Sequence, residues 1–208
     1  MAELTFYTNP MSRGQIARWM LEEVGADYDT VILGYADTMK APEYLAINPM
    51  GKVPAIVHRG QVVTEGAAIC AYLAEAFPEA GLAPRPDERA AYYRWLFYAA
   101  GVVEAAVTNK HMGWMPDEQQ QRTAGYGTYD LVVDVLDRQV GANAFVCGDR
   151  FTAADVYVGS QVIWGAQFGW LPQRDAFDGY IARLTARDAY VRAAALDDAA
   201  IAEMAPAA

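Results

Sequence analysis

The sequence predicts a mixed α/β domain followed by an all-helical domain. Up to about residue 77, short apolar strands alternate with amphipathic helices, whereas only helical patterns follow residue 86. A proline-rich segment separates these two halves. We therefore expect one domain over residues 1–80 and a second over residues 88–208, and a chain of 208 residues is long enough to bury a core in each.

The first half begins with a strand, a helix and a second strand. Leu4–Thr8 has the composition of a short strand, and Ser12–Val24 repeats its apolar residues at helical spacing up to a stop at Gly25. Tyr28–Leu33 is the second strand. These three elements form a β-α-β unit.

A hairpin and a helix complete the predicted first domain. Val53–Val57 and Gln61–Thr64 are short strands joined by a tight connection that contains Gly60, and Glu65–Phe77 is helical. The order β-α-β and then β-β-α predicts a mixed sheet of four strands packed with helices. The linker of residues 77–86 contains three prolines, which cannot continue a helix.

The second half carries helical signals only. Long helical stretches run from about Glu88 to Asn109 and from Asp117 to Gln139, and two further helices fit Asp175–Thr185 and Asp188–Glu203. Residues 151–156, FTAADV, have the pattern of a capping box with a hydrophobic staple, so another helix is expected to start there.

Composition and charge exclude several classes of function. The chain has 16 Lys and Arg against 26 Asp and Glu, and its net charge of −10 disfavours nucleic acids and anionic membranes as partners. The longest apolar runs, such as Trp95–Val103, are far shorter than the roughly 20 residues that span a bilayer, and the start resembles no secretory signal. We expect a cytoplasmic protein. Cys70 and Cys147 form neither a CxxC pair nor a metal-spaced set, which predicts two reduced thiols and no metal site.

The stretch NPMGKVPAI, residues 48–56, places a proline at the start of a predicted strand. Proline lacks an amide hydrogen, so it is tolerated in a sheet only at the first residue of a strand, at an edge or at a bulge. Pro54 therefore removes one donor from the sheet directly before the apolar run.

Taken together, these features resemble the cytosolic glutathione transferases, and in particular bacterial members of the serine type. The resemblance covers essentially the whole chain. It rests on the β-α-β-β-β-α order, NPMGKVPAI, TEGAAICAYL at residues 64–73, the proline-rich linker and FTAAD. It implies a thioredoxin-like first domain, an all-α second domain and a homodimer. It also implies that the glutathione thiolate is conjugated to small hydrophobic electrophiles, with glutathione as co-substrate and no other cofactor.

The resemblance assigns five residues to glutathione binding. It implies a cis bond before Pro54, with the main-chain amide and carbonyl of Val53 presented to the extended peptide. Lys52 would meet the glycyl carboxylate and Glu65 the γ-glutamyl ammonium. Gly66 stands where the family usually has serine, so a backbone donor remains and a hydroxyl is lost. Without the motif, Lys52 could equally be a solvated lysine of a loop. Glu65 could equally be an acidic residue that the helix dipole favours in the first turn.

The thiol would be activated at the start of the first helix. The segment Asn9–Gln15 contains no cysteine, which argues against disulfide exchange there. Ser12 falls where serine-type members hold their catalytic hydroxyl, and Arg13 adds a nearby positive charge. Ser12 and Gln15 also match an S-x-x-Q capping box, so Ser12 is equally read as a helix start. Tyr7, at the end of the first strand, is the alternative hydroxyl.

A pocket for the second substrate is expected between the domains, where helical aromatic residues meet the first loop. Its candidate residues are Met11, His111, Trp114, Met115, Trp164 and Phe168. Ordinary packing accounts for such residues as well, and His111 also fits a surface or capping histidine. Two alternative functions remain open. One is a glutathione-dependent isomerase or dehalogenase, and the other is a non-catalytic carrier or interaction protein of the same fold.

Overall fold

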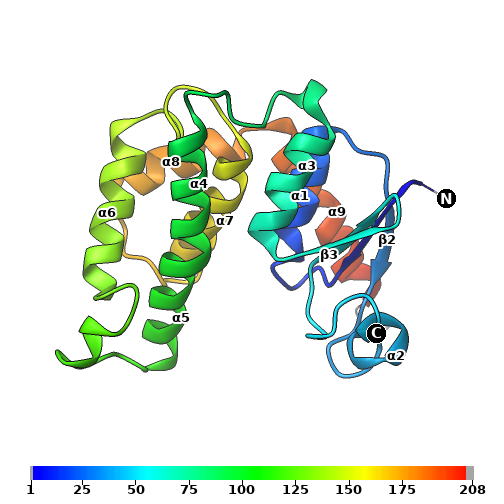
Figure 1. Cartoon of the computed structure of the whole chain (residues 1–208), viewed down its shortest axis with the longest axis horizontal. Helices are drawn as coiled ribbons and strands as arrows, with labels where there is room; N and C mark the ends of the chain where they lie inside the picture. Colours follow the sequence, from blue (N-terminus) through cyan, green and yellow to red (C-terminus); the bar gives the residue numbers. More distant parts are fainter. Residues whose placement is uncertain (1, 205–208) are drawn as a thin grey trace. The chain divides into compact units, whose positions relative to one another are not determined.

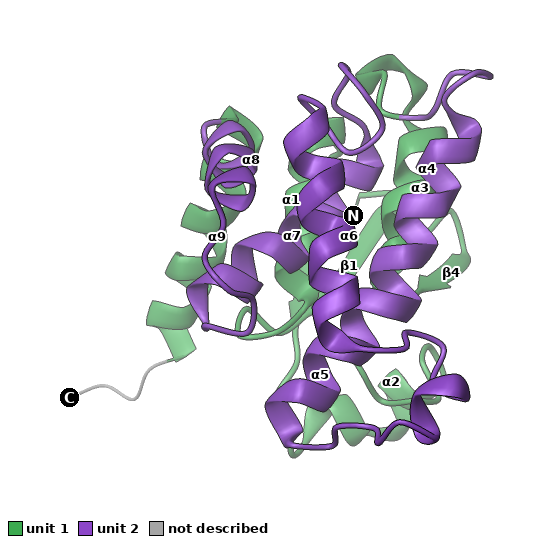
Figure 2. Ribbon diagram, turned by 90° about the vertical axis from the view of Figure 1, so that its left-hand side faces the viewer, with its two compact units in different colours: residues 1–82, 187–208 green, residues 83–186 purple. Residues whose placement is uncertain are grey.

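The computed structural model of the chain describes residues 2–204, which form two compact units. Unit 1 comprises residues 1–82 together with residues 187–208, and unit 2 comprises residues 83–186 (Figure 2). The sequence division into residues 1–80 and 88–208 differs from this at one point. The last helix, which the prediction counted with the helical domain, belongs to unit 1.

Unit 1 contains the predicted mixed sheet of four strands. Its strands are β1 (Leu4–Thr8), β2 (Asp29–Ile32), β3 (Ala55–His58) and β4 (Gln61–Thr64), arranged in the order β2-β1-β3-β4. β1 and β2 are parallel because a helix connects them, whereas β3 is antiparallel to both β1 and β4. The sheet topology confirms the β-α-β and β-β-α order.

The strand β3 begins one residue after the proline that the sequence placed in it. The prediction started this strand at Val53, but Ala55 is the first residue of the ladder, where it pairs with both Tyr7 and Thr64. Pro54 cannot donate to a neighbouring strand, which explains why the ladder starts after it. Because Ala55 pairs with both β1 and β4, the residue before it and the residues that follow Tyr7 and Thr64 lie together at one end of the sheet.

Four α-helices accompany the sheet in the described part of unit 1. They are α1 (Gly14–Val24), α2 (Pro42–Leu45), α3 (Gly66–Ala76) and α9 (Asp188–Met204), and 3-10 turns cover Thr38–Lys40 and Pro78–Ala80. The prediction began α1 two residues early, at Ser12. Its end at Gly25, which has φ 64°, is as predicted.

The short helix α2 covers a small core of its own. The sequence predicted only a loop here, although Pro42 stands at the favoured first helical position. Its buried members are Leu33, Met39, Tyr44 and Ala55, and partly buried Tyr7, Ile47 and Val53 pack against them. This cluster fixes the segment that leads into β3.

Charged pairs join α9 to α1, far along the chain from it. One pair is buried: the Nε of Arg18 donates to Asp197 at 2.7 Å, and their side chains are only 4% and 3% exposed. Two more pairs lie nearer the surface, Arg187–Glu23 at 2.6 Å and Arg192–Glu22 at 3.1 Å. These contacts explain why the last helix belongs with the sheet.

Unit 2 is helical, as predicted. Its helices are α4 (Arg89–Phe97), α5 (Glu104–Met112), α6 (Tyr129–Ala142), α7 (Ala153–Gln167) and α8 (Asp175–Thr185). α4 and α5 continue one another through a π-helical turn at Tyr98–Val103 (Figure 1), which divides the single helix expected for this stretch. Within the described chain, no helix has the length and apolar character needed to cross a membrane.

The predicted helix from Asp117 to Gln139 is wrong in its first half. α5 ends at Gly113, which has φ 72°, and α6 begins only at Tyr129. Between them lie a loop and a 3-10 turn at Gln120–Arg122. Gly127 adopts φ 68°, a conformation that ends helical geometry and that the periodicity of the apolar residues does not reveal.

The start of α7 confirms the predicted capping box and is closed by its own residues. The Asp155 carboxylate accepts hydrogen bonds from the amides of Thr152 at 2.9 Å and Val146 at 2.6 Å, and from the Tyr180 hydroxyl at 2.8 Å. Burial raises the pKa of Asp155. Every one of these partners is buried or nearly so, so this helix start is a structural element of unit 2.

Candidate functional site

The turn before β3 leaves main-chain groups unpaired. The bond between Val53 and Pro54 is cis, as expected. Within residues 2–204, neither the amide nor the carbonyl of Val53 has a hydrogen-bond partner. The Val53 side chain packs against the cluster beneath α2, which holds this residue in place. One donor and one acceptor therefore remain available on a fixed residue at the end of the sheet.

The carbonyls just before Val53 are bound by the protein itself. The Lys52 carbonyl accepts from the Tyr44 hydroxyl at 2.5 Å and from the Asn48 amide at 2.8 Å. The Gly51 carbonyl accepts from Lys40 Nζ at 2.6 Å. Sequence reasoning missed these three supporting side chains. Only Asn48, in the turn dipeptide Asn-Pro, carried a local signal.

A free cation and a free carboxylate flank this turn. The Lys52 side chain is exposed and forms no ion pair among the described residues. Glu65 is exposed and precedes α3 with φ 65°, a conformation uncommon for a non-glycine residue, and its side chain does not cap the helix. Gly66 is the first residue of α3, so amides of the first turn lack partners within the helix.

The strand register brings these residues to one end of the sheet. Ala55 pairs with Thr64 in β4 and with Tyr7 in β1. Continuing each strand by one residue places Glu65 and the end of β1 on either side of Pro54. The loop that enters α1 therefore starts beside the unpaired groups of Val53.

That loop, residues 9–12, is fixed by its own side-chain hydrogen bonds. Three successive carbonyls each accept from one side chain, so the loop has a defined shape. The bonds are Ser12 Oγ to Asn9 O at 2.6 Å, Gln15 Nε2 to Pro10 O at 2.7 Å, and Tyr35 Oη to Met11 O at 2.9 Å.

Ser12 is held differently from the predicted capping box. Its hydroxyl accepts from the amide of Gly14 at 2.9 Å rather than from that of Gln15, and it donates its hydrogen to the Asn9 carbonyl. The main-chain amide of Ser12 has no partner in the described part of the chain. Arg13 follows directly and precedes the first residue of α1. The donor that is available at this helix start is therefore an amide.

Tyr7 occupies the environment of a packed strand residue. Its ring centroid lies 5.6 Å from that of Tyr44, and its hydroxyl has no hydrogen-bond partner among residues 2–204. The neighbouring Thr8 hydroxyl is buried and likewise unpartnered. A Cβ at Gly14 would lie 1.9 Å from Thr8 Oγ1, so only glycine fits at this position of α1.

The candidate residues for the second substrate fall into separate groups. Met11, 58% exposed, lies in the loop of unit 1, and Trp164 lies on α7 in unit 2. His111 and Phe168 both pack against Trp170, a residue that the sequence did not single out, with ring centroids 4.9 and 5.1 Å away.

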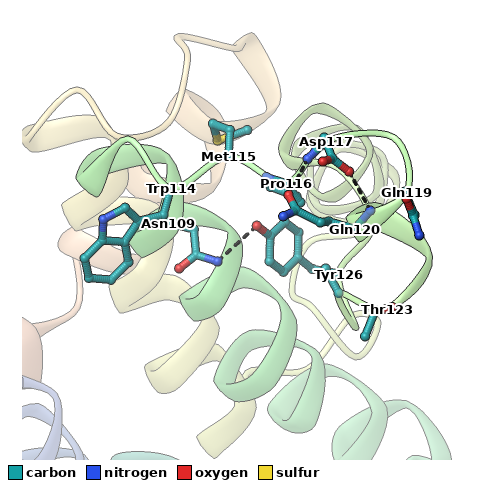
Figure 3. Close-up of a pocket in the computed structure, with 10 residues that line it drawn as sticks. Asn109, Trp114, Met115, Pro116, Asp117, Gln119, Gln120, Thr123 and Tyr126 are labelled. Carbon is teal, nitrogen blue, oxygen red and sulfur yellow. Dashed lines mark hydrogen bonds between the residues drawn. The ribbon is translucent and has the colours of Figure 1, made fainter.

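Trp114 and Met115 line a pocket of about 810 Å³ in unit 2 (Figure 3). This pocket lies beyond the end of α5, in the stretch where the sequence predicted a helix. A single pocket made of all six candidate residues stays a prediction.

The two cysteines are not reactive thiols. Burial raises the pKa of Cys70 strongly, and burial, with a smaller contribution from Asp155, raises the pKa of Cys147 to about 12. Both remain protonated near neutral pH. Among residues 2–204, no group of three His, Cys, Asp or Glu side chains is placed to hold a metal ion.

Comparisons with known proteins agree with this geometry. The family model of the glutathione S-transferase N-terminal domain matches residues 2–75. Glutathione S-transferase F10 of Arabidopsis thaliana is 30% identical over 168 residues, which cover 74% of this chain and 76% of that one. The maleylacetoacetate isomerase of Pseudomonas aeruginosa is 29% identical over 154 residues, covering 70% of this chain and 73% of that one.

A solved structure extends the match to the whole fold. The theta class glutathione S-transferase of Xanthomonas axonopodis pv. citri, crystallised with glutathione bound, superimposes with a TM-score of 0.74 at 26% identity, covering 93% of this chain and 98% of that one. This similarity confirms a thioredoxin-like domain followed by a helical region. The chain belongs to the glutathione S-transferase family.

Proposed function

We propose that this protein binds glutathione at the end of its sheet and conjugates the glutathione thiolate to small hydrophobic electrophiles. The observation that carries the proposal is the unpaired amide and carbonyl of Val53, on a residue fixed before cis-Pro54. An extended peptide can add to such a residue as a further strand would. The relative from Xanthomonas, which has glutathione bound, supports glutathione as the ligand.

The chemistry of the tripeptide fits the charges around Val53. Exchange of two main-chain hydrogen bonds requires a ligand residue with both an amide and a carbonyl, and cysteine is the middle residue of glutathione. Lys52 would then pair with the glycyl carboxylate, and Glu65 with the γ-glutamyl ammonium. The first-turn amides of α3, including that of Gly66, would receive the γ-glutamyl carboxylate at the positive end of the helix.

We assign thiolate stabilisation to the main-chain amide of Ser12 rather than to its hydroxyl. Lowering the pKa of a thiol by two units takes about 2.7 kcal/mol, a hydrogen bond to a charged group supplies about 1.5–3 kcal/mol, and a helix N-terminus about 0.3–1 kcal/mol. The hydroxyl would first have to give up its 2.6 Å bond to the Asn9 carbonyl. The amide needs no rearrangement, and Arg13 and the N-terminus of α1 add positive potential.

The reaction then follows from the thiolate. It attacks an electrophilic carbon, a carbon–sulfur bond forms, and a leaving group departs with the displaced electron pair or a proton is added to the product. Glutathione is the co-substrate, and the step needs no metal or other cofactor. The family resemblance supports a cytoplasmic homodimer, and we include this in the proposal.

A second candidate function is a glutathione-dependent isomerase. The similarity to the maleylacetoacetate isomerase of Pseudomonas aeruginosa favours it. The same thiolate would add to the substrate and leave again after a bond rotation, so that glutathione is returned unchanged. Product analysis separates the two, because a conjugate retains the tripeptide and an isomer does not.

Docking is tested by calorimetric titration with three ligands: glutathione, S-methylglutathione and glutathione methylated at the cysteinyl amide nitrogen. We expect S-methylglutathione to bind within a few-fold of glutathione, since its main chain is intact. The N-methylated peptide cannot donate to Val53, and its affinity should fall about 10-fold. Equal affinity of all three ligands would contradict main-chain docking.

Thiol activation is tested by the ultraviolet absorbance of the bound thiolate as a function of pH. We expect ionisation of the bound thiol well below the pKa of free glutathione. A bound thiol that titrates as in water would identify a non-catalytic carrier. Incubation with a panel of electrophiles, followed by product identification, then distinguishes transferase from isomerase.

A further inference from the structure

A second polar and aromatic site lies within unit 2, between the end of α5 and the start of α6. Ten residues line a pocket of about 810 Å³ there, a size typical of small-molecule sites (Figure 3). Figure 3 shows Trp114 and Asn109 on one side, Gln119 and Thr123 on the other, and Tyr126 between them. All ten lining residues belong to unit 2.

The loop that forms the pocket is held in shape by its own hydrogen bonds. The amide of Asp117 donates to the side chain of Gln120 at 2.8 Å, and the amide of Gln120 donates to the Asp117 carboxylate at 2.8 Å. At the end of α5, the amide of Trp114 donates to the Asn109 carbonyl at 2.8 Å. Little of the loop would have to be ordered on binding, which favours affinity.

One wall of the pocket presents large apolar surfaces. Trp114 is 62% exposed and Met115 is 44% exposed, although both side chains would gain from burial. An indole ring favours offset or edge contacts with another aromatic ring, and a thioether favours contact with a ring edge. This wall therefore suits a flat aromatic molecule.

The base of the pocket offers a paired donor and acceptor. Asn109 Nδ2 donates to the Tyr126 hydroxyl at 3.0 Å. This bond uses a lone pair of the hydroxyl and leaves its hydrogen available, and no described residue donates to Asn109 Oδ1. Tyr126 lines the pocket, so its free hydrogen is available to a ligand there.

The charge of the lining excludes anions. Asp117 is the one acidic residue of the lining, and none of the ten is Lys, Arg or His. A ligand carboxylate or phosphate would meet a like charge and no cation. Glutathione and its conjugates, which carry carboxylates, are therefore unsuited to this pocket.

We propose that this pocket binds an uncharged planar aromatic molecule that carries a hydroxyl group, such as a neutral phenol. Its ring contacts Trp114 and Met115. Its hydroxyl accepts the free hydrogen of Tyr126 and donates to Asn109 Oδ1. The proposal goes beyond glutathione transfer, because binding here needs neither glutathione nor the thiolate.

The test is equilibrium dialysis of the full chain, without glutathione, against three naphthalenes. We expect saturable binding of 2-naphthol, about 5-fold or more weaker binding of 2-methoxynaphthalene, which cannot donate, and no saturable binding of anionic 2-naphthoate. Equal binding of 2-naphthol and 2-methoxynaphthalene would contradict the donor and acceptor assignment, and binding of 2-naphthoate would contradict the charge argument.

Two variants and a matched control locate the site. Tyr126→Phe should weaken 2-naphthol about 5-fold and should also weaken 2-methoxynaphthalene, because the ether oxygen can accept the Tyr126 hydrogen as well, and Trp114→Ala should weaken both. Phe97→Ala, at an exposed aromatic residue of unit 2 that does not line the pocket, should change neither. Because Trp114 is largely exposed, its variant keeps the fold and decides the question even if Tyr126→Phe is destabilised. Unchanged binding in Trp114→Ala, or an equal loss in Phe97→Ala, would overturn the proposal.

Discussion

At the start of α7, two side chains of the protein itself occupy the free amides, whereas at the start of α3 no side chain of residues 2–204 does so. Asp155 is fully buried and accepts hydrogen bonds from both sides of its carboxylate. Glu65, the residue before α3, is turned by a positive φ into an exposed position and leaves the helix uncapped. We propose that the start of α7, saturated by its own side chains, serves folding and that the uncapped start of α3 serves a ligand.

The largest effect is expected from a substitution that removes the cap of α7. Asp155→Ala removes the acceptor for the amides of Val146 and Thr152 and for the Tyr180 hydroxyl, and leaves these buried donors unsatisfied. We expect a loss of about 3 kcal/mol or more in the free energy of unfolding, measured by urea denaturation. Glutathione affinity of the folded fraction should stay unchanged. A loss below about 1 kcal/mol would contradict the structural role.

The next largest effect is expected at the uncapped start of α3, where a substitution should weaken glutathione binding and leave the stability almost unchanged. Glu65→Gln keeps the size of the side chain and removes its charge, so we expect glutathione to bind about 10- to 100-fold more weakly, as measured by calorimetry. The free energy of unfolding should change by less than about 0.5 kcal/mol, because the side chain is exposed. Unchanged affinity would mean that Glu65 is only an acid near a helix dipole.

The residue before α4 provides an intermediate case, because its side chain forms an ion pair and does not cap the helix. Glu88 pairs with Arg150 and accepts from the Arg85 amide at 2.8 Å, and the hydrogen bond from Arg150 contributes most to lowering the Glu88 pKa to about 2 from its usual 4.5. Because the folded pKa is the lower one, the stabilisation is complete above about pH 4.5 and is lost as the pH falls towards 2.

In Glu88→Gln, the free energy of unfolding should therefore depend less on pH between about pH 4.5 and pH 2, and it should be lower at neutral pH. Thermal unfolding at a series of pH values measures this slope. Glu3 makes a suitable control, since its pair with Arg59 is exposed and Glu3→Gln should have little effect. An acid limb that is the same in Glu88→Gln and the unaltered chain would contradict the role of the pair.

Local sequence patterns predicted the elements whose determinants are close in the chain. The four strands, the stop of α1 at Gly25 and the capping box of α7 each depend on residues within a few positions of one another. The proline before β3 and the acid before α3 marked the candidate site for the same reason. These signals are local, so one sequence is enough to see them.

The features that the sequence did not predict depend on contacts between residues that are far apart in the chain. Arg18 and Asp197 are 179 positions apart, and nothing near either residue indicates that α9 packs on α1. Tyr35 binds the Met11 carbonyl across 24 positions, and so completes the loop before α1 without any local signal. The loop after Gly113 was read as helix because its polar residues favour helices, whereas its left-handed glycines end them.

The smallest expected effect sharpens the assignment of the thiolate donor at a further helix start, that of α1. If the amide of Ser12 holds the thiolate, Ser12→Ala keeps that donor and should raise the pKa of the bound thiol by less than about one unit, or about 1.4 kcal/mol. The lost bond to the Gly14 amide should cost about 1 kcal/mol of stability. Tyr7→Phe is the matched control for the alternative hydroxyl and should leave the thiol pKa unchanged. A pKa in Ser12→Ala equal to that of free glutathione would show instead that the hydroxyl leaves the Asn9 carbonyl on binding and becomes the donor.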